Sequence, residues 1–172
     1  QAEHDPDAIS VLVTDSLQVA RDTERAAEGM VVGWDRKTII SRALEHSFII
    51  TADTIDDCVE FANRFAPEHL ELMTKEDILP MIRNAGSIFV GEYAPVSAGD
   101  YASGTNHVLP TAGYARVFSG LNVDHFMKKS SVQVITKEGL ESIGDAIVAL
   151  AEAEGLGAHA EAVRLRFKMH KT

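Results

Sequence analysis

Ile9–Met30, ISVLVTDSLQVARDTERAAEGM, contains the two patterns that decide the fold. It opens with the β-branched run Ile9–Thr14, which is typical of a strand buried on both faces, as in a parallel sheet. Ser16 can then cap a helix that we expect over residues 17–28. Gly29 would lie just beyond that helix, at its C′ position. A buried strand followed at once by a helix indicates an α/β fold.

The same alternation continues along the chain. We expect strands over residues 48–51, 68–73 and 87–90 and helices over residues 36–46, 54–65 and 76–85. This order is typical of a Rossmann-like, doubly wound and mostly parallel sheet, here incomplete. Further on we expect a short helix over 123–129, a strand over 132–135 and two closing helices. We therefore divide the chain into an α/β portion, residues 1–122, and a mainly helical tail, residues 123–172, that would pack on a partner subunit.

The composition excludes several classes of partner. The 172-residue chain has a formal net charge of −10 and a mean hydropathy of −0.03. It has no basic stripe to neutralise phosphates, which argues against nucleic acid as a partner. No apolar run reaches the roughly 18 residues that a membrane-spanning helix needs. The single Cys58 excludes an internal disulfide, fits a reducing, cytoplasmic compartment, and is expected to be a small buried side chain.

Ser97–Thr111, SAGDYASGTNHVLPT, shows neither helical nor strand periodicity. Structureless loops longer than roughly 12–15 residues in a compact domain are usually functional or disordered. The apolar residues and few charges of this segment argue against disorder. Its carboxylate, imidazole, amide and hydroxyl groups suit binding, and it would follow a strand, where ligands collect in doubly wound sheets. This loop is our first candidate for the functional site.

Four pairs of polar residues could carry chemistry: Gln1 with His4, Glu68 with His69, Asp100 with His107, and Glu154 with His159. Imidazoles, a carboxylate and an amide oxygen could complete a zinc shell that keeps open positions. Glu68 and His69 could act as a base pair beside it. Each spacing is also typical of surface pairs, chain ends and turn caps. Spacing alone therefore leaves both a metal-binding enzyme and an ordinary α/β domain open.

Taken together and in this order, these pairs resemble the histidinol dehydrogenase family. The matching strings are QAEHD at 1–5, NRFAPEHLEL at 63–72, RNAGSIF at 83–89, GDY at 99–101, NHVLPT at 106–111, SGL at 119–121, and EGL at 154–156 with His159. They extend over nearly the whole chain, and the strings APEHLE and GTNHVLPT are long enough to be specific.

The resemblance implies a homodimeric zinc enzyme. It would oxidise L-histidinol to L-histidine in two NAD-dependent steps, through an enzyme-held aldehyde, as the last step of histidine biosynthesis. The resemblance gives the zinc ligands as Gln1, His4, Asp100 and His159. Zinc would hold the imidazole and amino nitrogens of the substrate, which is a positioning and polarising role.

The resemblance also assigns roles around the metal. His69 would be the general base that takes the hydroxyl proton as hydride leaves, and Glu68 would activate the water that hydrates the aldehyde. His107 would contact the substrate and Glu154 its polar end, beside the zinc ligands. The segment with Glu154 and His159 is implied to reach across the dimer, so that each site is shared between subunits.

Family members are far longer than this chain, which begins at the first zinc-ligand motif. We therefore expect a C-terminal portion of the enzyme, with the NAD-binding residues upstream, because no phosphate loop of the G-x-G-x-x-G kind occurs here. The alternative is a non-enzymatic fragment that binds zinc or an imidazole and lacks the NAD-binding half. The intact ligand and catalytic positions favour the enzyme, and the missing cofactor site favours the fragment.

Overall fold

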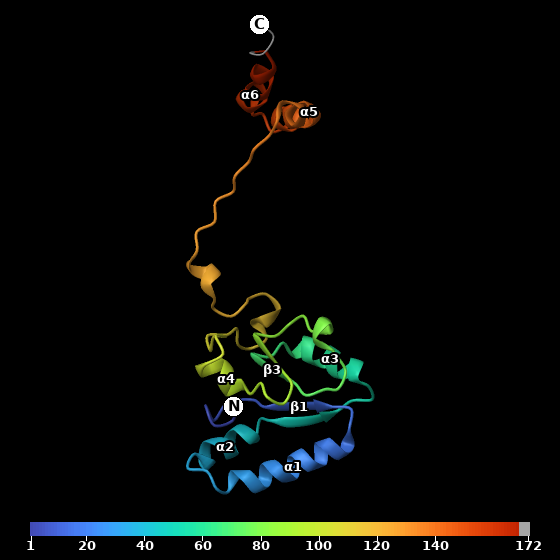
Figure 1. The fold of residues 1–172 in the computed structure, drawn as a ribbon, viewed down its shortest axis with the longest axis vertical. Helices are drawn as coiled ribbons and strands as arrows, with labels where there is room; N and C mark the ends of the chain where they lie inside the picture. The colour runs from blue at the N-terminus through green and yellow to red at the C-terminus, as the bar shows by residue number, and fades with distance from the viewer. Residues whose placement is uncertain (169–172) are drawn as a thin grey trace. The chain divides into compact units, whose positions relative to one another are not determined.

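The computed structural model describes residues 1–168 and divides into two compact units, Gln1–Phe126 and Met127–Thr172. The elements of the first unit are β1 (Val11–Thr14), α1 (Leu17–Val31), α2 (Lys37–Leu44), β2 (Phe48–Thr51), α3 (Ile55–Phe65), β3 (His69–Leu72), β4 (Ser87–Val90) and α4 (Val96–Tyr101), with 3-10 turns at Leu79–Met81, Tyr114–Arg116 and Val123–Phe126 (Figure 1). Among the described residues, no helix combines the length and the hydrophobicity needed to cross a bilayer.

The strands of the first unit form two separate parallel pairs. β1 pairs with β2, with Val11 opposite Phe48, and β3 pairs with β4, with His69 opposite Ser87. The prediction of an α/β fold with parallel strands is confirmed, but the described residues contain two two-stranded sheets in place of one continuous sheet. A two-stranded sheet is marginally stable by itself. The helices that cover these pairs therefore supply much of their stability.

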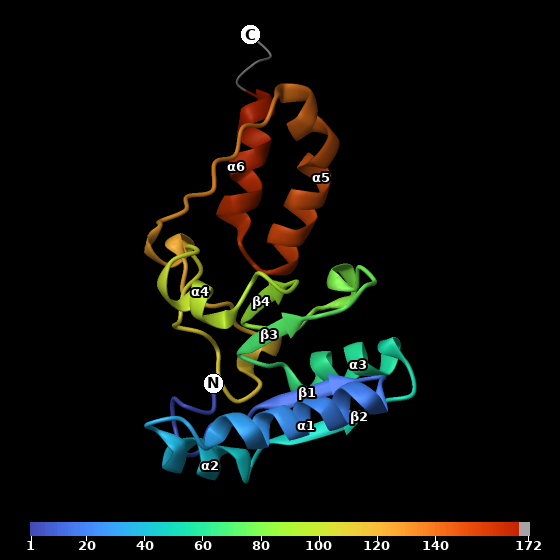
Figure 2. The same cartoon turned by 60° about the horizontal axis from the view of Figure 1, so that its bottom comes forward.

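α1 and α3 lie on opposite faces of the β1–β2 pair, as Figures 1 and 2 both show, so that helix, sheet and helix form three layers. Each of the two helices begins at a capping hydroxyl. Ser16 Oγ accepts a hydrogen bond from the backbone N–H of Val19 at 3.3 Å, and Thr54 Oγ1 accepts one from that of Asp57 at 3.2 Å. The Ser16 cap confirms the sequence prediction, because a hydroxyl at this position satisfies an N–H that the helix leaves free.

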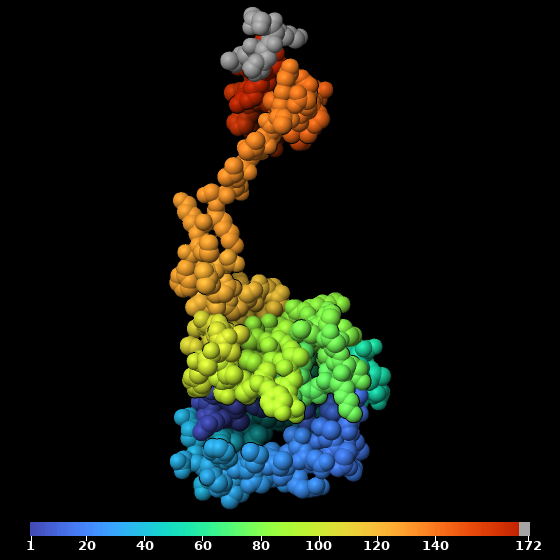
Figure 3. Space-filling model, in the orientation of Figure 1, coloured from blue at the N-terminus to red at the C-terminus, as the bar shows by residue number. Residues whose placement is uncertain are grey.

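α3 is shared by the two sheets. One side of it contacts β1, while Val59 on the other side packs with Leu72 of β3 and with Ile78 in the main buried cluster. In the space-filling view, the blue residues of β1, α1 and α2 and the green residues around β3 form adjoining layers of the first unit (Figure 3). The position of β3 thus depends on α3.

The helix predicted over residues 76–85 is wrong. Only the turn Leu79–Met81 forms there, with Pro80 inside it. The side chain of Asn63 explains why the helix does not continue: its Oδ1 accepts hydrogen bonds from the backbone N–H groups of Arg83 and Asn84, at 2.6 and 3.2 Å. A residue distant in sequence therefore takes the donors that a helix would have used.

The prediction that Ser97–Thr111 lacks structure is wrong in its first part, because α4 covers Val96–Tyr101. Glu71 of β3 helps to start this helix, since its Oε1 accepts a hydrogen bond from the backbone N–H of Val96 at 3.2 Å. The predicted end of α1 is also wrong. Gly29 does not adopt the left-handed conformation of a C′ residue, and the helix continues to Val31.

The second unit contains α5 (Lys137–Ala153) and α6 (Gly157–Lys168), packed against each other. The helices meet at small residues, because Ala160 is fully buried and a Cβ at Gly144 would lie 3.3 Å from the ring of Phe167. No strand forms over residues 132–135 within the described part of the chain, where the side chains of Val132 and Val134 are 86% and 89% exposed. The helix predicted over residues 123–129 is reduced to the 3-10 turn already named.

We expect Gly86→Ala to destabilise the first unit. A Cβ at Gly86 would lie 2.5 Å from the carbonyl oxygen of Glu68, so that backbone would have to move. The free energy of unfolding should fall by about 1–3 kcal/mol, as for other overpacked sites. Urea unfolding followed by circular dichroism measures this change.

Gly29→Ala is the matched control for that substitution. A Cβ at Gly29 meets nothing within 4 Å, and the residue lies in the helical part of α1. This substitution should stabilise the chain by about 0.5–1 kcal/mol, because alanine loses less backbone entropy in a helix. Equal effects of the two substitutions would contradict the close approach at Gly86.

The Cys58 thiol provides a pH-dependent test of the core around α3. Burial raises the pKa of this thiol, and the carboxylates of Asp15 and Asp57 raise it further. The folded chain therefore holds the thiol proton more tightly than the unfolded chain. The free energy of unfolding should fall as pH rises past the ordinary thiol pKa of about 8.5.

Comparison with Cys58→Ala isolates this contribution. Urea midpoints of the two proteins, measured from pH 7 to pH 10, should differ by a constant amount below about pH 8 and should converge above it. Two curves that stay parallel over the whole range would show that the thiol ionises equally in both states.

Candidate functional site

His69 and Asp100 are brought together by the packing of α4 on the β3–β4 pair. His69 Nε2 lies 3.7 Å from Asp100 Oδ1, and the two side chains are only 12% and 13% exposed. The imidazole also stacks on Phe89 of β4, with ring centroids 6.1 Å apart. α4 can approach this closely because residue 99 is glycine: a Cβ there would lie 2.5 Å from the Phe89 ring. Two of the predicted site residues thus meet within the first unit.

Neither member of this pair is satisfied by hydrogen bonds. His69 Nε2 is buried and has no hydrogen-bond partner among the described residues. The Asp100 carboxylate accepts no hydrogen bond from the described residues either, although it is largely withdrawn from water. A carboxylate in such a place costs free energy unless a cation or a donor compensates it. A nitrogen and an oxygen ligand left unsatisfied side by side fit zinc, which binds both.

The backbone at Glu68 and His69 is fixed by its neighbour in the sheet. Gly86 N–H donates to the carbonyl of Pro67 and Ser87 N–H donates to that of Glu68, both at 2.9 Å. Parallel pairing places Ser87 opposite His69, so that their side chains point to the same face. Glu68 itself is half-buried, and its carboxylate has no hydrogen bond among the described residues. The dipeptide is thus held firmly while its functional groups stay free.

The side-chain amides of Asn63 and Asn84 connect the segments that precede Glu68 and Ser87. Asn63, in the last turn of α3, donates to the carbonyl of Met81 at 3.0 Å, in addition to accepting from the Arg83–Asn84 backbone. Asn84 returns a hydrogen bond to the carbonyl of Asn63 at 2.9 Å. These bonds join the end of α3 to the segment that leads into β4, and so fix the two segments that carry Glu68 and Ser87.

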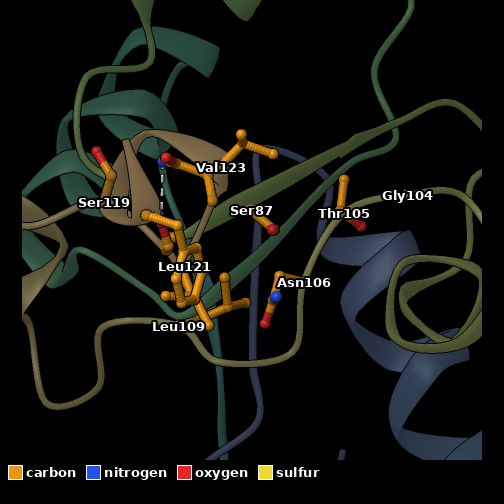
Figure 4. A pocket seen from close by; sticks show the side chains of 12 residues that line it. Ser87, Gly104, Thr105, Asn106, Leu109, Ser119, Leu121 and Val123 are labelled. Carbon is orange, nitrogen blue, oxygen red and sulfur yellow. Dashed lines mark hydrogen bonds between the residues drawn. The ribbon is translucent and has the colours of Figure 1, made fainter. Parts of the chain in front are cut away.

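A cleft of about 480 Å³ opens at Ser87. In Figure 4, Thr105 and Asn106 lie on one side of Ser87 and Ser119 lies on the other, with Leu109 and Leu121 between these sides. The remaining lining residues are Gly86, Gly104, Gly120, Asn122, Val123 and Phe126. Among the residues that the structure describes, no charged side chain lines the cleft. Four of its lining residues belong to the loop 97–111 that the sequence predicts as a functional site. The contributions of Ser87 and of residues 119–126 were not predicted, although the polar residue at the start of the apolar strand 87–90 was a usable indication.

The other predicted site residues of the first unit lie on its surface. Gln1 and His4 are exposed and form one turn, in which His4 N–H donates to the carbonyl of Gln1 at 3.1 Å. His107 is exposed at the tip of a turn that is closed by a 2.6 Å hydrogen bond from Val108 N–H to Asn106 Oδ1. The side chains of Gln1 and His4 make no hydrogen bond or ion pair with Asp100 within residues 1–168.

Glu154 and His159 belong to the second unit. Glu154 follows the end of α5, and His159 lies in the first turn of α6; both side chains are exposed. The described residues contain no group of three or more histidine, cysteine, aspartate or glutamate side chains able to hold a metal ion. Of the predicted ligand set, the described residues therefore place Asp100 next to His69 and Gln1 next to His4, and they do not gather the four ligands into one shell.

Comparison with known proteins decides the family. A family model described as "Histidinol dehydrogenase" matches residues 1–167. The chain belongs to the histidinol dehydrogenase family. It is 54% identical over 169 residues to the histidinol dehydrogenase of Methanosarcina mazei and 52% identical over 170 residues to that of Methanocaldococcus jannaschii.

The structural comparison agrees. The fold matches the crystal structure of histidinol dehydrogenase from Elizabethkingia anophelis with a TM-score of 0.91 and 43% sequence identity, over 99% of this chain. The chain spans 39% of the length of each of the two archaeal relatives and 40% of the solved chain. The family resemblance read from the sequence is thus confirmed, and the part of the enzyme represented here is well under half.

We expect Asp100→Asn to stabilise the metal-free chain. The substitution keeps the shape of the side chain and removes a charge that is 13% exposed and lacks a donor. The free energy of unfolding should rise by about 1 kcal/mol or more. Urea unfolding in the presence of a chelator measures this change.

Asp35→Asn provides the matched control, since this carboxylate is exposed. Its effect should stay within about 0.5 kcal/mol, as for other surface substitutions. A loss of stability at Asp100→Asn would show that the carboxylate is already compensated without a metal, and would remove the main argument for a cation beside His69.

Proposed function

We propose that this chain supplies the zinc-binding and proton-transferring part of a histidinol dehydrogenase, which oxidises L-histidinol to L-histidine with NAD. The observation that carries the proposal is the buried His69 Nε2, which has no hydrogen-bond partner among the described residues and lies 3.7 Å from Asp100 Oδ1. Buried polar atoms are nearly always satisfied in proteins, and the exceptions call for a function. A metal and a substrate would satisfy both atoms.

The proposed zinc ligands are Gln1, His4, Asp100 and His159. They offer an amide oxygen, two imidazoles and a carboxylate, a donor set that zinc accepts. When bound, zinc would hold the imidazole and amino nitrogens of histidinol and polarise the group that reacts. The exposed side chains of Gln1, His4 and His159 are free to take up such positions.

His69 is the proposed general base. Its Nε2 has no partner among the described residues, so its lone pair can accept the hydroxyl proton of the substrate. At the same time, hydride passes to NAD from the carbon that bears this hydroxyl. This step gives the aldehyde. Stacking on Phe89 holds the imidazole plane while the proton moves. The ring is thus pre-oriented, as a base must be to act efficiently.

Glu68 is the proposed base for the second step. Its carboxylate would take a proton from the water that adds to the aldehyde, and the hydrated aldehyde would then lose a second hydride to a second NAD to give the carboxylic acid. His107 and Glu154 are proposed to contact the substrate, with Glu154 at its polar end. The paired backbone at Glu68 keeps the two bases adjacent through both steps.

The remaining features concern the whole protein. We propose a cytoplasmic homodimer in which Glu154 and His159 of one subunit complete the site of the other. The α5–α6 unit fits a role at an interface, because Ile143, Leu150 and Leu165 are 44%, 67% and 47% exposed. The two strand pairs are proposed to belong to Rossmann-like, doubly wound sheets of the full-length enzyme, with the NAD-binding residues expected outside this chain.

Calorimetric titration of the 172-residue chain with zinc and then with L-histidinol tests the proposal. We expect histidinol to bind only after zinc. His4→Ala and His159→Ala should each weaken zinc binding at least about tenfold, because each removes one ligand. His46→Ala, at an exposed position after α2, is the matched control and should change neither titration.

Mixing the two variants tests the shared site. If His4 and His159 of different subunits meet, a mixed dimer of His4→Ala and His159→Ala chains contains one intact site, and about half of the zinc capacity of such dimers returns. If both ligands come from one chain, mixing restores nothing. Zinc-independent histidinol binding, or full binding in both variants, would instead favour a non-enzymatic imidazole-binding fragment.

A further inference from the structure

We propose that Glu71 is a positioning residue: by holding the first turn of α4, its carboxylate fixes Asp100 beside His69. This inference rests on the proposed function, since it concerns the placement of a proposed zinc ligand against the proposed base. It goes beyond that function because Glu71 belongs to none of the four predicted pairs of polar residues and lies exposed on β3.

The start of α4 takes a hydrogen-bond acceptor from elsewhere in the chain. A helix leaves its first backbone N–H groups without partners, and a side-chain oxygen at the N-cap ordinarily satisfies one of them. The N-cap of α4 is Pro95, whose side chain contains no acceptor. Glu71 Oε1 instead accepts a hydrogen bond from the N–H of Val96 at 3.2 Å. A helix of only six residues is thus anchored at its start by a carboxylate of the neighbouring strand.

The alternation of β3 directs Glu71 and His69 to the same face. Residues two apart on a strand point to the same side of the sheet. Leu70 and Leu72 point to the other side, where they pack in the buried cluster beside α3. One face of β3 therefore carries apolar side chains for α3, and the other face carries the proposed base and the carboxylate that anchors α4.

The two contacts of α4 with this second face match in spacing. Val96 and Asp100 are four residues apart, which is about 6 Å along a helix. His69 and Glu71 are two residues apart, which is about 6.6 Å along a strand. Glu71 therefore contacts one end of a helical turn, and His69 Nε2 lies 3.7 Å from Asp100 Oδ1 at the other end. Because one turn of helix joins the two contacts, a shift of the first would displace the second.

The remainder of α4 is also held closely, so that Asp100 has little freedom. Gly99 lies against the ring of Phe89, where a Cβ would come within 2.5 Å of a ring atom. Thr105 Oγ1 donates a hydrogen bond to the carbonyl of Gly99 at 3.1 Å. These contacts set the distance of α4 from the sheet, and the bond to Glu71 sets where the helix begins along it. A carboxylate held in this way is pre-oriented for a metal ion.

The imidazole resonances of His69 test the placement of Asp100 without any metal. Two-dimensional ¹H–¹⁵N spectra of the 172-residue chain, recorded with a chelator at one fixed pH, detect this ring. Asp100→Asn defines the shift change that follows loss of the carboxylate. Glu71→Ala should change the same resonances in the same direction. Adding Glu71→Ala to Asp100→Asn should change them no further, since both substitutions act on one contact.

Three further variants separate the hydrogen bond from the charge of Glu71. Glu71→Gln removes the charge but keeps an acceptor oxygen at the same reach, so it should preserve the resonances. Glu71→Asp keeps the charge on a side chain one methylene shorter, so it should resemble Glu71→Ala, and it decides the question if the alanine variant misfolds. Glu92→Ala removes an exposed carboxylate three residues before Pro95 and should change nothing. Equal effects of alanine and glutamine at residue 71 would overturn the inference.

Calorimetric titration of the same chains with zinc gives a second readout. Glu71→Ala should weaken zinc binding by about threefold to tenfold, because loss of the hydrogen bond releases Asp100 from its place. Glu71→Gln and Glu92→Ala should stay within about twofold of the unsubstituted chain, as for other surface substitutions. Circular dichroism shows whether each variant is folded.

The two readouts keep this inference and the proposed function apart. If the unsubstituted chain binds no zinc, the proposed zinc site is overturned, and the His69 resonances alone decide the inference. Changed resonances with unchanged zinc affinity would support the placement of Asp100 by Glu71 and would remove Asp100 from the zinc ligands. Resonances that do not respond to Glu71→Ala, or to Asp100→Asn itself, would overturn the inference and leave the proposed function standing wherever zinc still binds.

Discussion

The backbone hydrogen bonds between residues 67–68 and 86–87 hold the rest of the candidate site in place. They require the close approach of Gly86 to the Glu68 carbonyl, which no residue with a side chain allows without displacement. Once this contact forms, His69 and Ser87 lie opposite each other, and Ser87 lines the cleft. The absence of a Cβ at residue 86 thus permits the strand pairing that places His69 opposite Ser87.

α3 connects the two strand pairs of the first unit. It packs against β1 on one side and against Leu72 on the other, and its Asn63 organises the segment before β4. The helix therefore acts on the site twice, through an apolar contact that places β3 and through an amide that places β4. The apolar packing contributes most of the stabilising free energy, and the hydrogen bonds of Asn63 fix how the segment before β4 is positioned against α3.

The sequence predicts the parts of this structure that depend on near neighbours. The strands of the first unit, the Ser16 cap, the buried Cys58 and the α5–α6 region follow from local pattern, and the family follows from strings around Glu68 and Asn106. The features that it does not predict depend on contacts between distant residues. Asn63 prevents a helix over 76–85, and Glu71 caps α4 inside a segment read as a loop. The division into two strand pairs likewise concerns pairing partners, which local periodicity cannot specify.

The brevity of the four strands has a consequence for how the chain behaves in concentrated solution. Each two-stranded sheet leaves two open edges, and open edges invite strand addition by neighbouring molecules. Within residues 1–168 every strand has four residues, so an edge offers only a few unpaired backbone groups to such an encounter. The formal charge of −10 adds mutual repulsion between chains. Short edges and like charge together favour colloidal stability over fibril growth.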